Sequence, residues 1–231
     1  MGLKEDLISE VNQTFATKWE EQKTTDVPDP ENLQLKSNHA KYLEGATVLY
    51  ADIDDSTSIV DKFKWFFSAG VYKAYLRCAG QIIRSENGTI TAYDGDRIMA
   101  VFTGGSKNTN AVRAALKINY SVVDIIRPAI KNRYPKSDFL FKHVIGIDSS
   151  QLHTARIGVH GDNDLVWIGR AANYAAKLCT LSDKPVWITN AVYDKMSKEV
   201  KFSNSINMWT PHKWTAMNEM EIFATTYHWK L

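Results

Sequence analysis

The sequence has few cysteines and no long hydrophobic run. Its two cysteines, Cys78 and Cys179, lie far apart and outside any CxxC spacing, which excludes a disulfide scaffold and a cysteine-ligated zinc site. Each falls in an apolar helical pattern, so we expect buried, reduced thiols. A run of about 18 apolar residues and a signal peptide are both absent, so we expect a cytoplasmic protein that does not enter the membrane.

An excess of either charge is also lacking. Lys and Arg number 28 against 26 Asp and Glu, which gives a net charge of +2, and no basic run is interleaved with aromatics. Nucleic acid is therefore excluded as the main partner. A hydrophobic content of 44% and a charged content of 23% are those of an ordinary globular protein. The length fits one domain of about 150–200 residues plus an extension.

We expect the extension at the N-terminus. Residues 3–20 carry an apolar stripe at helical spacing, with Glu and Lys on the other side: Leu3, Leu7, Ile8, Val11, Phe15 and Trp19. Such a helix needs a partner for its stripe, either its own domain or a second chain. Residues 24–38 are rich in Pro, Asp, Asn and Ser and are typical of a linker. The predicted organisation is an N-terminal helix and linker over 1–44 and one domain over 45–231.

The domain alternates between strand and helix patterns. In chain order we predict a strand at 46–53, a helix at about 57–86, a hairpin at 88–103, a helix at 106–131, strands from about 138 to 158, a short strand at 165–167, a small-residue helix at 171–181, and strands at 186–188 and 221–227. Within this series, 145–148 and 154–159 are predicted to form an antiparallel pair. The order predicts an α/β (α+β) sandwich with a ferredoxin-like βαββαβ core and added strands.

The strand at 46–53 runs directly into carboxylates. Side chains alternate along a strand, so Asp52 and Asp54 are expected on one side and Ile53 on the other. Carboxylates at the end of a buried strand cost solvation energy unless a cation meets them, and hard divalent cations prefer oxygen ligands. A helix start is the alternative interpretation, because residues 54–57 are all good N-cap residues.

A second acidic motif follows in the hairpin at 88–103. Two β-prone runs flank Asp94-Gly95, which is a strong turn signal. Turn chemistry explains these two residues but not the further acid at Asp96, which we expect at the start of the returning strand. If the hairpin pairs with the first strand, Asp52 and Asp96 converge on a pair of metal ions.

Three segments together resemble the catalytic domain of class III nucleotidyl cyclases, over about residues 48–181. They are Tyr50-Ala51-Asp52-Ile53, then Tyr93-Asp94-Gly95-Asp96-Arg97-Ile98-Met99-Ala100-Val101-Phe102, and Gly169-Arg170-Ala171-Ala172-Asn173-Tyr174-Ala175-Ala176-Lys177-Leu178. The resemblance implies the class III cyclase fold and a homodimer with composite active sites. It implies that Asp52, Asp96 and the Ile53 carbonyl hold two Mn²⁺ or Mg²⁺ ions. Asn173 and Lys177 would stabilise the transition state from the opposite subunit.

The sequence departs from the family where purines are recognised. Ala92 and Val166 stand at the two positions that hydrogen-bond the purine edge in the family, so a purine would leave polar groups unpaired, at roughly 1–3 kcal/mol each. Lys177 replaces the family's Arg and keeps the charge without the bidentate fork. Tyr50 replaces the common Phe and adds a hydroxyl beside the metal motif.

These departures leave three interpretations. The pattern resembles the pyrimidine cyclases of Pycsar antiphage systems, which implies conversion of UTP or CTP to a 3′,5′-cyclic monophosphate that a separate effector protein senses. Tyr50 and Arg97 are hydrogen-bond donors and favour uracil over cytosine, although the Asp94 carboxylate would favour cytosine if it reached the base. The alternatives are an adenylate or guanylate cyclase with an unusual base pocket, or a degenerate nucleotide-binding or dimerisation module.

Overall fold

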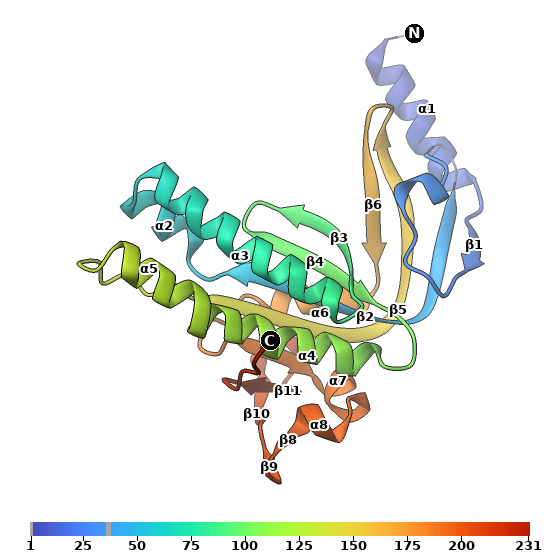
Figure 1. The fold of residues 1–231 in the computed structure, drawn as a ribbon. Coiled ribbons are helices and arrows are strands. Elements are labelled where there is room, and N and C mark those ends of the chain that lie inside the picture. Colours follow the sequence, from blue (N-terminus) through green and yellow to red (C-terminus); the bar gives the residue numbers. More distant parts are fainter. Residues whose placement is uncertain (1, 36–37) are drawn as a thin grey trace.

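Strands β2 (His39–Ile53) and β5 (His143–Val159) form the centre of the fold in the computed structural model, which describes residues 2–35 and 38–231 (Figure 1). The main sheet runs in the order β10 (Thr210–Trp214), β11 (Met220–Thr225), β7 (Val186–Thr189), β5, β2, β4 (Arg97–Phe102) and β3 (Thr89–Asp94). The order β5-β2-β4-β3 is that of a ferredoxin-like βαββαβ unit. The predicted fold class is confirmed.

Two helical segments cover one face of this sheet. The first is split into α2 (Ser56–Lys62) and α3 (Trp65–Ser85), where one helix was predicted, because Phe63 has extended backbone angles. The second runs through α4 (Lys107–Tyr120), a π-helical stretch at Ser121–Ile126 and α5 (Arg127–Arg133). Pro128 lacks an N–H and crowds the preceding turn, which accounts for the wider π turn there.

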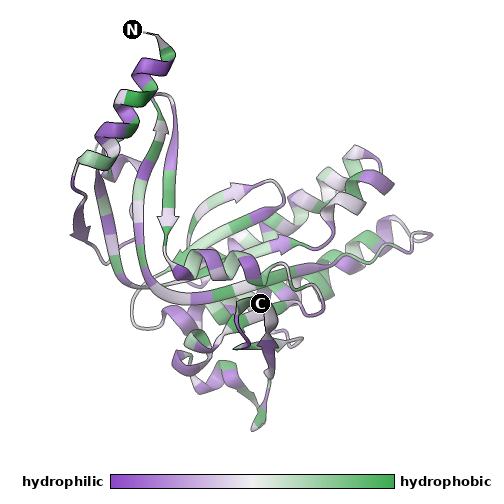
Figure 2. Ribbon diagram, turned by 180° about the vertical axis from the view of Figure 1, so that it is seen from behind, coloured by the Kyte–Doolittle hydropathy of each residue, from purple (hydrophilic) through white to green (hydrophobic). Residues whose placement is uncertain are grey.

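The main hydrophobic core lies between these helices and the sheet. It includes the fully buried side chains of Leu49, Ile83, Ile98, Leu116 and Ile145. Because side chains alternate along β2, the residues on either side of Leu49 face the other way. Figure 2 shows the apolar colouring concentrated in these layers.

The opposite face of the sheet is covered by α6 (Arg170–Leu178), which packs on Val48, Met99 and Leu152 through Ala171 and Ala175. The helix approaches β5 closely at Gly146. A Cβ at Gly146 would lie 2.1 Å from the carbonyl oxygen of Ala175, so only glycine permits this packing. The small-residue pattern of the helix is thus explained by its contact with the sheet.

The outer halves of β2 and β5 leave the core as an extended arm (Figure 1). There β6 (Asp162–Ile168) pairs antiparallel with β5 through a turn at Gly161, and β1 (Glu20–Lys23) pairs parallel with β2. The predicted antiparallel pair of 145–148 with 154–159 is wrong. Both segments belong to the single strand β5, because no turn residue interrupts it and its partners are β2 and β6.

Helix α1 (Leu3–Ala16) lies at the end of the arm and ends four residues earlier than predicted. None of its residues is buried, so its apolar stripe has no partner in the described part of the chain. The predicted linker at 24–38 contains a short 3₁₀ turn (Pro30–Asn32), and its residues 36 and 37 lie outside the described residues. Strand β2 crosses residue 45, with a register shift between Leu43 and Ala46. The division into 1–44 and 45–231 stays a prediction.

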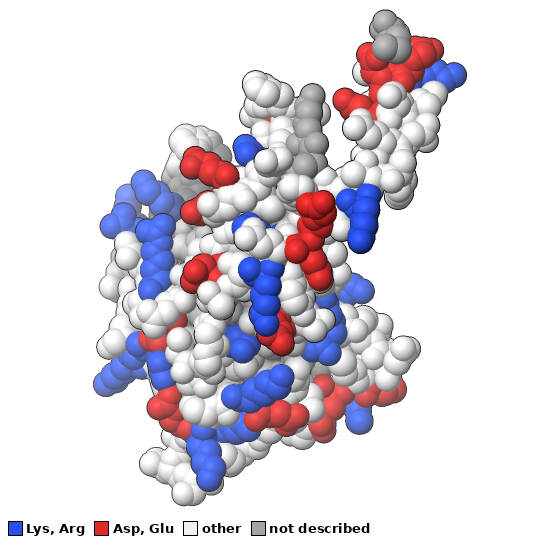
Figure 3. All heavy atoms as spheres, turned by 90° about the vertical axis from the view of Figure 1, so that its right-hand side faces the viewer, with Lys and Arg blue, Asp and Glu red and all other residues white. Residues whose placement is uncertain are grey.

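The remaining elements extend the β7 side of the sheet. They are α7 (Asn190–Lys195), α8 (Lys198–Lys201), the small hairpin β8 (Phe202–Ser203) and β9 (Ile206–Asn207), and a 3₁₀ turn at Thr215–Met217. Strands β1 and β10 were not predicted. No helix in the described ranges is long and apolar enough to cross a membrane. Figure 3 shows the arm side of the molecule, on which acidic and basic side chains are interspersed.

Candidate active site

Asp52 and Asp96 lie close together at one end of the sheet, on the face that carries α6. Asp52 is the last polar residue of β2, and its partly buried carboxylate accepts a hydrogen bond from the Ile53 N–H at 3.1 Å. Burial raises the pKa of Asp52 to about 6, and the Asp96 carboxylate adds to the rise. A carboxylate whose ionisation is opposed by burial and by a second carboxylate favours a bound cation.

The hairpin turn between β3 and β4 sets the position of Asp96. Asp94 and Arg97 pair as the last strand residues, so Gly95 and Asp96 form a two-residue turn. Gly95 has a φ of 60°, as the first central position of a type II′ turn requires. Asp96 is thus the second residue of the turn. The sequence had predicted it as the first residue of the returning strand. The turn still brings its carboxylate to Asp52.

Arg97 connects the acidic pair to Tyr50. Its Nη2 lies 3.2 Å from the Asp94 carboxylate, and its guanidinium carbon lies 5.2 Å from the centre of the Tyr50 ring. Burial raises the pKa of Tyr50, while the charge of Arg97 acts in the opposite direction. A cation, a hydroxyl and a carboxylate are therefore adjacent to the metal candidates, where a nucleotide would present its base or phosphates.

The two residues proposed to face the base lie on different strands. Ala92 in β3 pairs with Met99 in β4, which pairs with Tyr50 in β2, so the three residues form one row across the sheet. Val166 lies in β6 and pairs with Ala155 in the arm. The structure therefore places Ala92 in the same row as Tyr50, with Met99 between them, and places Val166 in the arm.

Asn173 and Lys177 project from the outer face of α6. Both side chains are exposed, whereas Ala171, Ala175 and Leu178 on the inner face are buried. Positions four residues apart share a helix face, so the amide and the ammonium point away from the sheet together. The Nζ of Lys177 lies 3.9 Å from the sulfur of Met217. In one chain these two side chains face away from the strand that carries Asp52.

The donors at the acidic pair suit a hard divalent cation. Carboxylate oxygens of Asp52 and Asp96 and the main-chain oxygen of Ile53 are the ligand types that Mg²⁺ and Mn²⁺ prefer. No group of three or more His, Cys, Asp or Glu within the described ranges is arranged to hold a metal, and the proposed set has only two such residues. Asp54 lies beyond the strand in a separate pocket with Lys62 and Lys142.

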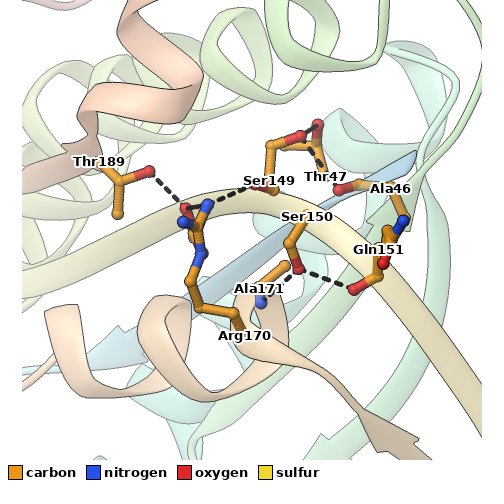
Figure 4. Close-up of polar contacts among 9 residues, drawn as sticks. Ala46, Thr47, Ser149, Ser150, Gln151, Arg170, Ala171 and Thr189 are labelled. Carbon is orange, nitrogen blue, oxygen red and sulfur yellow. Dashed lines mark hydrogen bonds and ion pairs between the residues drawn. The ribbon is translucent and has the colours of Figure 1, made fainter. Parts of the chain in front are cut away.

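A polar cluster between α6 and β5 was missed from the sequence (Figure 4). The buried Asp148 carboxylate accepts hydrogen bonds from Arg170 and Thr189, and Arg170 also donates to the Ser149 carbonyl at 2.7 Å. The sequence contained one signal of this cluster. Arg170 begins a helix, where a positive side chain opposes the helix dipole and so requires a negative partner.

Comparison with known proteins finds relatives that share one name. A uridylate cyclase from Burkholderia cepacia is 59% identical over 230 residues, which cover 100% of this chain and 99% of that protein. A uridylate cyclase from Xanthomonas perforans is 45% identical over 231 residues, with 100% of both chains covered. No protein-family model matches the sequence.

Solved structures show the same fold at low identity. The adenylyl cyclase CyaB from P. aeruginosa superposes with a TM-score of 0.67 and 18% identity, over 80% of this chain and 95% of that one. A guanylyl cyclase domain from Blastocladiella emersonii, described as dimeric, superposes with a TM-score of 0.63 and 15% identity, over 80% of this chain and 97% of that one. Identities this low show the fold alone.

Proposed function

Because this chain belongs to the uridylate cyclases, enzymes with the class III nucleotidyl cyclase fold, we propose that it converts UTP to the 3′,5′-cyclic monophosphate and pyrophosphate. The observation that carries this proposal is that one fold contains both an acidic pair and an apolar residue in the row of Tyr50. Asp52 and Asp96 lie close enough for one charge to act on the other, as two ligands of a cation would, and Ala92 lies in one row with Tyr50.

Two divalent cations, Mn²⁺ or Mg²⁺, are proposed to bind Asp52, Asp96 and the Ile53 carbonyl. When bound, they lower the pKa of the ribose 3′-hydroxyl and offset the charge of the triphosphate. The hairpin turn and the end of β2 hold the two carboxylates in place before substrate arrives. This preorganisation reduces the cost of assembling the site.

A second subunit is proposed to complete the site. Asn173 and Lys177 face outward from α6, so they are available to a neighbouring chain rather than to Asp52 of their own. Asn173 would orient the ribose, and Lys177 would offset charge developing on the phosphates during attack of the 3′-oxygen on the α-phosphorus. A symmetric homodimer would contain two such sites.

Selection of a pyrimidine is proposed to follow from the missing purine-reading groups. Ala92 and Val166 have no polar group to offer a purine edge, whose donors and acceptors would then be desolvated without partners. Tyr50 and Arg97 lie in contact and supply donors for the carbonyl oxygens of uracil. Arg97 is also paired with Asp94, which satisfies that carboxylate and leaves it less free to accept from the cytosine amino group.

We further propose that the cyclic nucleotide is a second messenger in antiphage defence and acts on a separate effector protein. This rests on the resemblance of the motifs to Pycsar cyclases.

The substrate is tested by incubating the purified protein with each of the four ribonucleoside triphosphates and Mn²⁺, with products identified by mass spectrometry. Cyclic UMP is expected to dominate. Dominant cyclic CMP would reverse the preference between the two pyrimidines. Cyclic AMP or cyclic GMP as the main product would overturn the base-pocket argument, and no product with any triphosphate would favour the degenerate binding module.

The composite site is tested by mixing two inactive variants, Asp52→Ala and Asn173→Ala. Each mixed dimer would contain one site with both defects and one intact site. If subunits exchange at random, half of the dimers are mixed and activity returns to about a quarter of the wild-type value. A mixture that exchanges subunits, as shown by mass-labelled chains, but stays inactive contradicts the shared site.

A further inference from the structure

The carboxylate of Asp148 is fully buried in the middle of β5, directly beneath α6. It accepts hydrogen bonds from the Nε of Arg170 at 3.0 Å and from its Nη2 at 3.2 Å, and a third from the Thr189 hydroxyl on β7. A buried charge is tolerated only with a partner of opposite charge and with its lone pairs satisfied. Asp148 therefore fixes the point on the sheet to which Arg170 must reach.

Arg170 is the first residue of α6 and a costly choice for that position. A positive side chain at a helix N-terminus opposes the helix dipole. Its guanidinium nevertheless makes three hydrogen bonds, two to Asp148 and one to the Ser149 carbonyl, while the side chain as a whole remains 44% exposed. Because the guanidinium binds both a carboxylate and a carbonyl, it fixes the direction of the Arg170 side chain as well as its distance from β5.

Further contacts secure the same end of the helix (Figure 4). The Ala171 N–H donates to the Ser150 hydroxyl at 2.9 Å, which in turn donates to the Gln151 carbonyl at 2.7 Å. One turn later the helix rests on Gly146 without an intervening side chain. Rotation or sliding of α6 on β5 is thus opposed by directional bonds at its start and by backbone contact at its middle.

Asn173 and Lys177 follow Arg170 by three and seven residues on the same helix, so a rotation or shift of α6 moves both of their side chains. We propose that Arg170, through Asp148, is a positioning residue that sets the rotation and height of α6 and so places Asn173 and Lys177 against the substrate in the neighbouring subunit. This rests on the proposed composite cyclase site. Arg170 acts through the helix and does not itself contact the reacting atoms.

The first test is Arg170→Lys, which keeps the charge and removes the fork. A displacement of about 1 Å at a catalytic group costs on the order of 100-fold in rate. We therefore expect kcat for UTP to fall by roughly 10–100-fold while KM stays within about 3-fold. The matched control is Arg113→Lys on α4, which alters an arginine that also holds a buried carboxylate, Glu86, but lies away from α6. It should keep wild-type kcat.

The second test assigns the defect to one half of the site. Arg170→Lys mixed with Asp52→Ala should recover activity, because the mixed dimer contains one site with an unaltered α6 and an unaltered Asp52. Arg170→Lys mixed with Asn173→Ala should not recover, because every site then has a defective α6. Recovery in both mixtures or in neither, or a wild-type kcat for Arg170→Lys, overturns the positioning role.

Two further measurements distinguish a loss of positioning from a loss of stability and from a failure of the shared site. If Arg170→Lys lowers the melting temperature more than Arg113→Lys does, Asp148→Asn replaces it, since it keeps the size of the buried side chain and weakens its bonds to the Arg170 guanidinium. The same fall in kcat and the same mixing pattern are expected, and wild-type kcat in Asp148→Asn would then overturn the proposal. Failure of the Asp52→Ala and Asn173→Ala mixture would instead overturn the shared site itself.

Discussion

At Asp52, the requirements of folding oppose those of the proposed metal site. Burial and the nearby Asp96 raise its pKa from 3.8 to about 6. Between these values the folded chain keeps a proton that the unfolded chain has lost, so the contribution of Asp52 to stability falls as pH rises from about 4 to 6 and stays low above it. A cation at the site would compensate for this loss.

We therefore predict that Asp52→Asn raises the melting temperature of the metal-free protein at pH 7.5 and abolishes turnover. The loss of activity should exceed the roughly 10–100-fold that removal of an outer-shell partner costs. Added Mn²⁺ should raise the melting temperature of the wild type and leave that of the variant unchanged. Asp162→Asn, at an exposed position in the arm, is the control and should change neither property. A less stable Asp52→Asn protein, or one with near-normal turnover, contradicts the assignment.

His143 makes the opposite contribution to pH dependence. Its ring is buried beside that of Tyr75, with the ring centres 5.7 Å apart, and neither ring nitrogen has a hydrogen-bond partner among the described residues. Burial lowers the pKa of His143 from 6.5 to about 3, with the charge of Arg127 acting in the same direction. Below pH 6.5 the unfolded chain binds a proton that the folded chain refuses, so stability falls as pH falls.

Replacing the ring with an uncharged one should remove this acid sensitivity. We predict that His143→Phe flattens the fall in unfolding free energy between pH 6.5 and 4, where one such group contributes up to about 1.4 kcal/mol per pH unit. Urea unfolding at a series of pH values measures the slope. His160→Gln, in the exposed turn between β5 and β6, should keep the wild-type slope. Equal slopes for His143→Phe and wild type would refute the prediction.

At the scale of elements, the contact between α6 and β5 determines where the helix that carries Asn173 and Lys177 lies. A Cβ on Gly146 would overlap the Ala175 carbonyl, so Gly146→Ala must displace the helix. We predict a loss of about 1–3 kcal/mol in stability, as for other overpacked sites, together with a loss of turnover. Gly70→Ala in α3 is the matched control, because nothing lies within 4 Å of the added Cβ and alanine favours a helix by roughly 0.5–1 kcal/mol. Thermal melts and UTP turnover of both variants check this, and a stable, active Gly146→Ala protein would rule it out.

The elements that were predictable from the sequence are those fixed by local chemistry. The Asp94-Gly95 turn and the helical pattern over α3 depend on neighbours a few residues away, and the sequence shows them directly. The continuity of β5 was not predictable in this way, since its two halves pair with β2 and β6, which are distant in sequence. The Asp148–Arg170 pair joins residues 22 apart, and only the fold shows that one lies beneath the other. The proposed meeting of Asn173 and Lys177 with Asp52 would involve a second chain, which no pattern within one sequence places.

At the scale of the whole molecule, α1 is a helix whose apolar face is not covered by the described part of its own chain. Its five large apolar side chains, Leu3, Leu7, Ile8, Val11 and Phe15, are each between 51% and 86% exposed. The helix is joined to the arm by β1 and by hydrogen bonds from the Asn38 side chain to the carbonyls of Thr14 and Thr17. In Figure 3 it projects from the surface, with its charged side chains gathered near the N-terminal end. An amphipathic helix of 14 residues is marginal in water without a surface to cover its apolar face.

We predict that this stripe contributes to association between two copies of the chain. Removal of residues 1–17 leaves β1 intact and takes away no buried side chain, so the melting temperature of the remaining fold should change little. Dimerisation, measured by analytical ultracentrifugation across a concentration series, should weaken, and specific activity should fall at low protein concentration and recover at high concentration. Full-length Phe15→Ser should show the same change to a lesser degree, while Gln13→Ser, on the side of α1 opposite the stripe, should not. If the truncated protein instead loses stability and remains an active dimer, the stripe covers its own domain and does not contribute to association.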